Sequence, residues 1–330
     1  MLKCNITIGK YTFTRCAGAE VERSIHDIVD TCKIKLPVAV ITMDNAGKWA
    51  TDITDVVKVG DKVEAFFYYE DYEQYGEKFN GWVRKVNYAY PAEIEIENDA
   101  WLLRKAIDKK AFAKASIKSI VEYIVKGLGI KLYPKMPAMQ IDTYNVKANN
   151  ALVELERLRD EFNMVCFFTK DNTLYFGPAY THKFDDDEAQ NTVKYALSGP
   201  TTNLIDATSL KYVYSDERKL EIKAMAFVGG NKKIELSVGK SGGDSRTMWF
   251  TASDKKTLEE QALQKLKEFN YDGYEGSLKT FLIPLAKPAM SALITDPVFG
   301  REGRYFIEAV KTEWGTGGAR RDVSISIKLN

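Results

Sequence analysis

The chain has 330 residues, of which 45% are hydrophobic and 28% are charged, a composition typical of globular proteins with a sizeable core. A chain of this length is expected to form two to four domains. Its 47 basic and 46 acidic side chains give a formal charge of +1. This near neutrality argues against nucleic-acid binding as the main function, because phosphate recognition requires a basic surface.

Neither targeting signals nor paired cysteines are evident in the sequence. The N-terminal residues MLKCNITIGKYTF lack the apolar stretch of a secretory signal, and no run approaches the ~18 apolar residues of a membrane span. We therefore expect synthesis in the cytoplasm and no membrane partner. The four cysteines, Cys4, Cys16, Cys32 and Cys166, contain no CxxC pair, so they are expected to be buried free thiols rather than zinc or redox ligands.

Residues 1–98 consist of short strand-like runs between polar turns, and they predict a first small antiparallel β-barrel. The runs cover 3–13 (a hairpin that turns at Gly9 and Lys10), 32–36, 61–69, 82–90 and 93–97. Alternation places four side chains on one face of the third run, namely Val63, Ala65, Phe67 and Tyr69. The segment SIHDIVD at 24–30 resembles a loop or a single helical turn.

From residue 99 the apolar period lengthens, which predicts a small mixed α/β domain over 99–182. A first helix is expected over 116–128, with Ser116 as its N-cap and Gly129 beyond its end. A hairpin is expected where the strand-like runs 165–168 and 173–176 flank a polar turn.

A second helix in this domain is predicted to begin at Asn149 or Asn150. Its apolar stripe consists of Leu152, Leu155, Leu158 and Phe162. On the polar side of the same helix, Arg157 has the spacing to pair with both Glu154 and Glu161.

Residues 183–203 are polar and include the acidic run 185–188, so they are predicted to form a linker. Strands resume afterwards and predict a second antiparallel β-barrel over 204–330, interrupted by a helix over 254–269 with Ser253 as its cap. The expected strands cover 210–214, 220–228, 232–238, 276–283, 304–314 and the alternating segment from Val323. The turn 315–321, which carries Arg320 and Arg321, is either a contact loop or a solvated hairpin.

Two parts of the chain are weakly alike. VKVGDKVEAFFYY (57–69) leads to NGWVRKV (80–86), and MSALITDPV (290–298) leads to GRYFIEAV (303–310). Each is a strand, a glycine-containing turn and a returning strand that carries aromatic residues and ends in valine. The likeness fits two copies of one barrel, separated by inserted domains.

No catalytic, cofactor or metal site is predicted. The sequence contains no GxSxG, P-loop or HExxH motif, and its two histidines, His26 and His182, are far apart, which disfavours histidine-based catalysis. The acidic run 185–188 lacks the spacing of a calcium loop. The segments 229–231 and 241–244 are interpreted as hairpin turns rather than phosphate-binding loops. We therefore do not expect an enzyme.

Aromatic residues are abundant, with 16 Phe, 18 Tyr and 5 Trp. The cluster 66–69 with Trp82 has the composition of a platform for sugars or nucleobases. Such residues more often fill small barrels and interfaces, and that is the interpretation we favour.

The order of units resembles the central baseplate hub protein of contractile-tailed bacteriophages. That fold is shared with the N-terminal part of type VI secretion spike proteins and with hubs of related contractile injection particles. The likeness rests on spacing and residue type in EVERSIHDIVDTCKIKLP, KVGDKVEAFF, NGWVRKV, SIKSIVEYIVKGLGIKL, NNALVELERLRDEFNMVCFFTKDNTLYFG and GRYFIEAVKTEWGTGGARRDVSISIKL. Spike proteins continue into an OB domain and a β-helix, whereas this sequence ends at Asn330, which favours a separate hub.

The resemblance implies a homotrimer in which two barrels per chain make a pseudo-sixfold ring. Such a ring joins the hexameric tail tube to the trimeric spike and continues the central channel, through which DNA passes without specific binding. The implied partners are further copies of the chain, the tail tube protein and the spike protein, with other baseplate proteins or the tape measure as additional candidates. The implied location is the baseplate of a virion or injection particle assembled in the bacterial cytoplasm.

Two other functions remain open at this stage. The first is a tail-associated protein that degrades polysaccharide or peptidoglycan, which requires a cleft with a pair of carboxylates. The second is a generic oligomeric module, such as a tube-like structural subunit, for which one barrel is sufficient.

Overall fold

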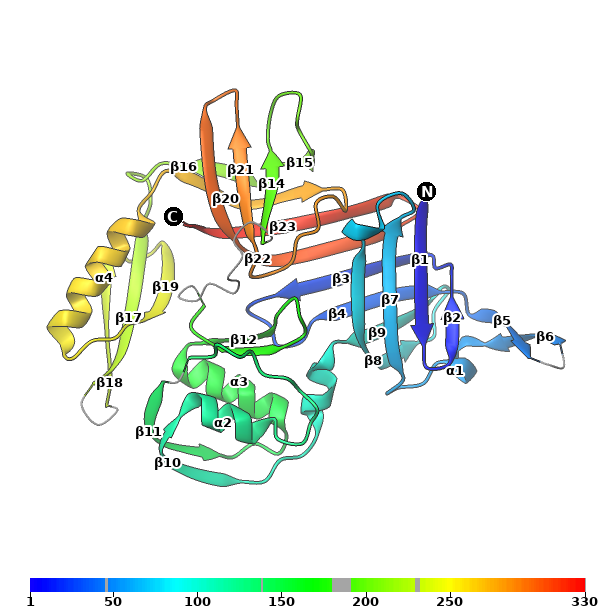
Figure 1. Cartoon of the computed structure of the whole chain (residues 1–330), viewed down its shortest axis with the longest axis horizontal. Helices are drawn as coiled ribbons and strands as arrows, with labels where there is room; N and C mark the ends of the chain where they lie inside the picture. Colours follow the sequence, from blue (N-terminus) through cyan, green and yellow to red (C-terminus); the bar gives the residue numbers. More distant parts are fainter. Residues whose placement is uncertain (45–46, 138, 180–190, 229–231, 330) are drawn as a thin grey trace.

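The computed structural model of the chain describes residues 1–44, 47–137, 139–179, 191–228 and 232–329, with side chains of 41–50 left out. The protein is mainly β, as predicted. Most strands belong to one large sheet, and two helix-containing units lie beside it (Figure 1). In the described parts of the chain, no helix has both the length and the apolar character needed to cross a membrane.

The large sheet has fourteen strands, which come from the two ends of the sequence. The N-terminal half of the sheet contains β1 (Leu2–Ile8), β2 (Tyr11–Phe13), β3 (Gly18–Ser24), β4 (Thr31–Leu36), β7 (Lys62–Tyr69), β8 (Glu77–Asn87) and β9 (Ala92–Glu97). The C-terminal half contains β14 (Thr192–Ala196), β15 (Leu204–Asp206), β16 (Leu210–Val213), β20 (Gly273–Thr280), β21 (Ser291–Asp296), β22 (Arg301–Gly315) and β23 (Gly318–Leu329).

The two halves are joined edge to edge, because β22 pairs with β3. The strand order in the N-terminal half is β3-β4-β9-β8-β7-β1-β2, and β22 is followed outward by β23 and β20 in the C-terminal half. Among the described strands, no sheet closes into a barrel through its hydrogen bonds. Figure 1 shows β22 and β23 lying beside β3 and β4, so that the halves form one continuous layer.

The N-terminal half forms its core as its alternation predicts. Ile6 and Ile8 of β1 and Val63, Ala65 and Phe67 of β7 are buried in one cluster. The predicted face is therefore confirmed except for Tyr69, which is half-buried. The sequence missed β3 and the hairpin of β5 (Ala39–Asp44) and β6 (Gly47–Asp52). Two short helices, α1 (Ile53–Val56) and η1 (Glu73–Tyr75), connect the strands.

The middle unit contains both predicted helices. Its elements are η2 (Asp99–Arg104), β10 (Lys110–Ser116), α2 (Ile117–Ile124), β11 (Gln140–Val146), α3 (Ala151–Phe162), β12 (Val165–Phe168) and β13 (Leu174–Gly177). The caps are the predicted ones, since Ser116 accepts from the Ser119 amide and Asn150 from the Val153 amide. However, α2 ends at Ile124, one turn earlier than predicted, and the pair β10–β11 was missed.

The position of Glu154 differs from the prediction that it lies on a polar helix face. Its side chain is fully buried. It accepts hydrogen bonds from the Tyr144 hydroxyl (2.6 Å) and from the amides of Lys147 (3.0 Å) and Ala148 (2.7 Å), and it pairs with Arg157 as expected. The buried carboxylate is therefore satisfied by the Tyr144 hydroxyl of β11 and by two backbone amides that follow this strand.

The helix predicted inside the second β-region belongs to a separate small unit. This unit contains β17 (Leu220–Val228), β18 (Lys232–Gly239), β19 (Asp244–Trp249) and α4 (Lys255–Phe269). The three strands form their own sheet, and α4 covers one face of it. The helix cap is Asp254, which accepts from the Thr257 amide at 2.9 Å, rather than the predicted Ser253.

Part of the predicted linker is a strand. Residues 183–190 lie outside the described residues, but β14 occupies the following positions and pairs in parallel with β21. The four cysteines are all free, as expected; Cys4, Cys32 and Cys166 are buried, and Cys16 is partly exposed.

Candidate functional site

The junction of the two sheet halves is the most distinctive feature of the molecule, and we call it the internal seam. β3 and β22 run antiparallel through it, from the pair Ser24–Ala309 to the pair Gly18–Gly315. On one face of the seam, the Lys311 ammonium contacts Glu20 at 2.8 Å and Glu22 at 2.9 Å. Backbone pairing and charge therefore both join the ends of the sequence.

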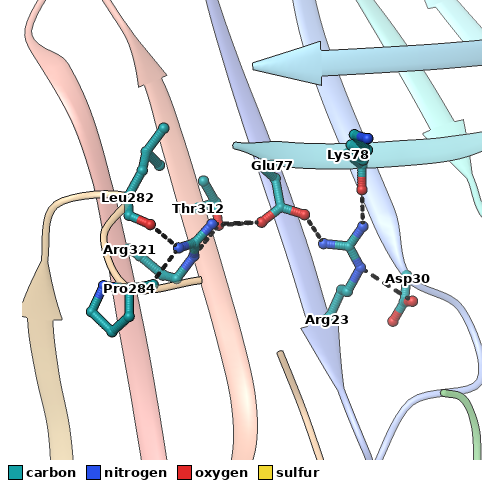
Figure 2. Close-up of polar contacts among 8 residues, drawn as sticks. All are labelled: Arg23, Asp30, Glu77, Lys78, Leu282, Pro284, Thr312 and Arg321. Carbon is teal, nitrogen blue, oxygen red and sulfur yellow. Dashed lines mark hydrogen bonds and ion pairs between the residues drawn. The ribbon is translucent and has the colours of Figure 1, made fainter. Parts of the chain in front are cut away.

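The other face of the seam buries a network of charged side chains. Figure 2 shows Arg23 and Arg321 approaching Glu77 from opposite sides. Glu77 and Arg321 are both completely inaccessible to solvent. An Nη atom of Arg321 lies 3.1 Å from Oε2 of Glu77, and Arg23 binds Oε1 of the same carboxylate. One buried anion thus links two cations that belong to different halves of the sheet.

The remaining donors of the two arginines also have partners. Arg321 donates to the Leu282 and Pro284 carbonyls (2.9 Å to Pro284) and to the Thr312 hydroxyl at 3.4 Å. The Thr312 hydroxyl in turn donates to Glu77 at 3.1 Å. A buried guanidinium requires this degree of satisfaction, because an unpaired buried donor costs about 1–3 kcal/mol.

Arg23 makes its further contacts within the N-terminal half. Its Nη2 donates to the Lys78 carbonyl at 2.7 Å, and its Nε lies 3.7 Å from Oδ2 of Asp30. Because Arg23 is in β3, Glu77 begins β8 and Arg321 is in β23, the network connects strands that are distant in both sequence and sheet order.

The network moves the pKa values of its two carboxyl groups in opposite directions. Burial alone would raise the pKa of Glu77, but the charges of Arg23 and Arg321 outweigh it and lower the pKa to about 2. Burial raises the pKa of Asp30 to about 7, although Arg23 acts in the opposite direction. Glu77 is therefore the permanent anion of the network, and Asp30 titrates near neutral pH.

Replacing Asp30 by asparagine is expected to remove a pH dependence of stability. The folded-state pKa of Asp30 lies above its unfolded value, so the wild-type protein loses stability as the pH rises through this range. Between pH 6 and pH 8 that loss amounts to ~1.4 kcal/mol relative to Asp30→Asn. Urea unfolding of both proteins at the two pH values measures it, and equal pH dependence in the two proteins would contradict the assignment.

The two carboxyl groups do not have the geometry of a catalytic pair. Separated pKa values are typical of an acid and a base in an active site. Asp30 lines a polar cavity of about 220 Å3, but Glu77 does not. Both oxygens of Glu77 are occupied by Arg23, Thr312 and Arg321, and the side chain is buried. The arrangement can hold two halves of a sheet together, and the Glu77 carboxylate is not accessible to a substrate.

The features considered from sequence do not assemble into a second site. His26 is exposed and lies 3.7 Å from Glu308, which raises the pKa of the imidazole. His182, the acidic run 185–188 and the segment 229–231 lie outside the described residues. Residues 241–244 are not the predicted hairpin turn, because they lead from β18 into β19 and these strands pair with opposite sides of β17. Within the described ranges, no group of three or more His, Cys, Asp or Glu side chains is arranged to hold a metal ion.

The aromatic cluster is only partly a surface feature. Phe67 is buried in the N-terminal core, and Phe66 stacks on Tyr68 with ring centroids 4.4 Å apart. The Trp82 indole donates to Asp99 at 3.1 Å. These contacts are those of residues that fill and brace the sheet.

The charged residues of the network were missed by the sequence analysis. Arg321 was placed in a turn that is either a contact loop or a solvated hairpin, but the structure buries it completely, while Arg320 is exposed. The only available signal was that Arg23 and Arg321 occupy strand positions among alternating residues. Nothing local to either position indicates the partner, because Glu77 is 244 residues away from Arg321.

Several solved structures share this fold. The 43 kDa tail protein of prophage MuSo2 from Shewanella oneidensis is 13% identical, with a TM-score of 0.59, over 98% of this chain and 97% of that one. A tail protein from Neisseria meningitidis MC58 is 12% identical, with a TM-score of 0.60, over 100% and 97%. Neither a family model nor a curated protein matches the sequence.

A third structure connects the fold to secretion systems. It is an E. coli protein described as a component of the type VI secretion system with structural similarity to the T4 bacteriophage tail proteins gp27 and gp5. It is 10% identical, with a TM-score of 0.54, over 100% of this chain and 77% of that one. The resemblance indicated by the sequence is therefore confirmed for the fold, which this chain shares with these phage tail and type VI secretion proteins.

Proposed function

We propose that the protein is a structural component of a phage tail or related injection particle, and that it serves there as the baseplate hub. In this role three copies form a ring that joins a hexameric tail tube to a trimeric spike and continues the central channel. The partners are the tail tube and spike proteins, and the location is the baseplate. The observation that carries the proposal is a repeat of strand order within the large sheet.

The repeat matches six strands of each half. The N-terminal order is β1-β7-β8-β9-β4-β3, and the C-terminal order is β14-β21-β22-β23-β20-β16. One difference is that β1 runs antiparallel to β7, whereas β14 runs parallel to β21. Two equivalent halves in one chain are what a trimer needs to present six similar units around an axis.

An irregularity in pairing fixes the correspondence residue by residue. In β8 the register against β9 shifts between Val83 and Lys85, just beyond Trp82, the last residue paired with β7. In β22 the register against β23 shifts twice, between Tyr305 and Ile307 and between Ile307 and Ala309. The second shift lies just beyond Phe306, the last residue paired with β21, and matches the one in β8. The equivalent positions are Trp82 and Phe306, Val83 and Ile307, and Lys85 and Ala309. Each pair is separated by 224 residues. Because such bulges are specific features of a strand, their coincidence supports two copies of one barrel-like fold.

The proposal makes the function architectural rather than catalytic. A chain with two similar units presents a pseudo-sixfold face to a hexamer, and three chains present a threefold face to a trimer. Permanent ring contacts of this kind bury about 2,000 Å2 or more and are rich in apolar and aromatic residues. Both carboxylate oxygens of Glu77 are occupied by hydrogen bonds within the chain. Glu77 therefore gives no support to the alternative of a polysaccharide- or peptidoglycan-degrading protein.

Native mass measurement tests the proposal. The expected result is a species of three times the 37.3 kDa chain, formed by the protein alone or after addition of the tail tube and spike proteins. A protein that remains monomeric or dimeric under all of these conditions would overturn the proposed function.

A further inference from the structure

Among the strand edges of the large sheet that have no partner in the described structure, two belong to the counterparts of the strands in the internal seam. One is the edge of β8 beyond Val83, on the side where β7 has already ended. The other is the edge of β16 that faces away from β20. These edges lie at opposite ends of the sheet path β16-β20-β23-β22-β3-β4-β9-β8, on either side of the internal seam (Figure 1). Unpaired edges of this kind tend to bind another strand.

The internal repeat shows what the free β8 edge would bind. Its counterpart is the part of β22 beyond Phe306, and that part is paired with β3 in the internal seam. The counterpart of β3 in the C-terminal half is β16. This equivalence follows from tracing paired residues across each half. From β8 to β3 the paired residues are Val83, Ile96, Cys32 and Val21. From β22 to β16 they are Ile307, Ile325, Gly276 and Leu210.

Residues of β22 in the internal seam are more buried than their counterparts in and after β8. This difference is expected if β8 lacks the neighbouring strand that β3 provides to β22. Thr312 in the internal seam is 2% exposed, whereas Tyr88, its counterpart after β8, is 54% exposed. Val310 is buried, but its counterpart Val86 is half-buried. In each pair, the residue in the internal seam is covered by β3, whereas no strand pairs with its counterpart on that side among the described residues.

We propose that β8 of one copy pairs antiparallel with β16 of a second copy of this chain, repeating the internal seam between molecules. This inference rests on the proposed ring and adds its contact surface and register. In the internal seam, Val310 pairs with Arg23 and Lys311 with Glu22. The equivalent pairs between copies are Val86 with Tyr212 and Asn87 with Lys211. Because the two edges are different, the contact is head-to-tail, and in the proposed trimer it closes into a ring after three copies.

Exposed aromatic residues occur on both sides of the proposed contact. Beside β16, the Arg301 guanidinium lies 3.8 Å from the ring centre of Tyr212 and donates to the Tyr214 hydroxyl at 3.0 Å. Phe299, next to this cluster, is 68% exposed. Beyond β8, Tyr88 and Tyr90 are exposed and their hydroxyls lie 3.5 Å apart. Arginine and tyrosine are enriched in interface hot spots, and the proposed register brings these two groups together.

The repeat also predicts where the two clusters meet. Arg301 occupies the position equivalent to Glu77, which in the internal seam accepts hydrogen bonds from Thr312 and Arg321 of the other half. Tyr212 occupies the position equivalent to Arg23, which binds the same carboxylate. The counterpart of Thr312 is Tyr88. A neighbouring copy therefore places Tyr88 against Arg301 and Tyr212, so that an aromatic and cation–π contact replaces the buried ion network.

Disulfide trapping tests the register. The double variant Asn87→Cys/Lys211→Cys places one cysteine on each edge, and directly opposed residues of antiparallel strands lie at distances that a disulfide spans. Mild oxidation is expected to link chains into covalent dimers and closed trimers on a non-reducing gel. Neither single variant is expected to cross-link, since the two edges differ. Asn87→Cys/Val213→Cys, offset by two residues, is the matched control and is expected to cross-link much less.

The outcomes separate this inference from the proposed function. Trimers by native mass that cross-link through positions 87 and 211 support both. Trimers in which this pair stays reduced, or in which a single variant cross-links to itself, overturn the proposed contact and leave the ring intact. Monomers under every condition overturn both.

Discussion

Glu77→Gln is expected to lower the free energy of unfolding by about 3–5 kcal/mol, because it leaves the buried Arg321 without its counter-charge and removes one of the two carboxyl groups beside Arg23. Glutamine preserves the shape of the side chain, so the loss reports on charge rather than on packing. Urea unfolding followed by circular dichroism measures the effect. Since the network links both halves of the sheet, the whole β-region is expected to unfold at the lower urea concentration.

The pH dependence of the same variant provides an independent check. The pKa of Glu77 is lowered to about 2, so its stabilising effect is complete above its ordinary pKa and is lost as the pH falls towards 2. The difference between wild type and Glu77→Gln is therefore expected to shrink in acid. Glu64→Gln, on the exposed part of β7, is the matched control and should change stability by less than about 0.5 kcal/mol. Equal effects of the two substitutions would show that the network does not stabilise the protein.

Trp249→Ala is expected to cost about 3–5 kcal/mol, the range for truncating a large buried aromatic residue. Trp249 ends β19 and is buried against the middle unit. Its indole donates to the Phe162 carbonyl at the end of α3 at 2.8 Å and stacks on Phe227 with centroids 4.8 Å apart. The substitution therefore removes both apolar contact and a buried hydrogen bond between two units.

Thermal unfolding of the purified protein measures this second effect. The small β17–β19 unit is expected to lose its attachment to the middle unit, which would appear as an earlier or separate transition. Leu263→Ala on the outer side of α4, where the side chain is 42% exposed, is the control and is expected to change stability little. An unchanged melting curve for Trp249→Ala would contradict the view that the units are firmly packed together.

Local patterns predicted much of the fold. The two helices of the middle unit were found because caps and an apolar stripe of period 3.6 occur in one short segment. The hairpin of β12 and β13 was found from its polar turn. β3 was missed because its sequence, GAEVERS, is mostly polar and has only Ala19 and Val21 on its buried face. Its strand character depends on pairing with β4 and with β22, which is distant in sequence.

The site could not be predicted because it is made of contacts between the ends of the sequence. Arg321 looks like a turn residue beside Arg320, and its burial depends on Glu77 from the N-terminal half. Glu154 was also predicted to be exposed, because it lies on the polar face of α3. Its burial depends on contact with Tyr144 of β11. The sequence pattern of a charged residue is the same whether the residue is exposed to solvent or buried with all its hydrogen bonds satisfied.

The internal repeat has a structural consequence for assembly. If β22–β3 is the contact between halves within one chain, β8–β16 is its equivalent between chains, and alternation of the two contacts generates a ring of six similar units. The ion network then belongs to the contacts inside chains, and the aromatic clusters near Tyr88 and Arg301 to the contacts between them. This difference would give the ring three permanent seams and three that form on assembly.

A three-dimensional reconstruction of the purified assembly by electron cryomicroscopy tests the central claim most directly. The account predicts three copies around an open channel, with the N-terminal and C-terminal sheet halves alternating and β8 of each copy beside β16 of the next. Assemblies in which the halves do not alternate, or in which the two edges remain apart, would contradict it.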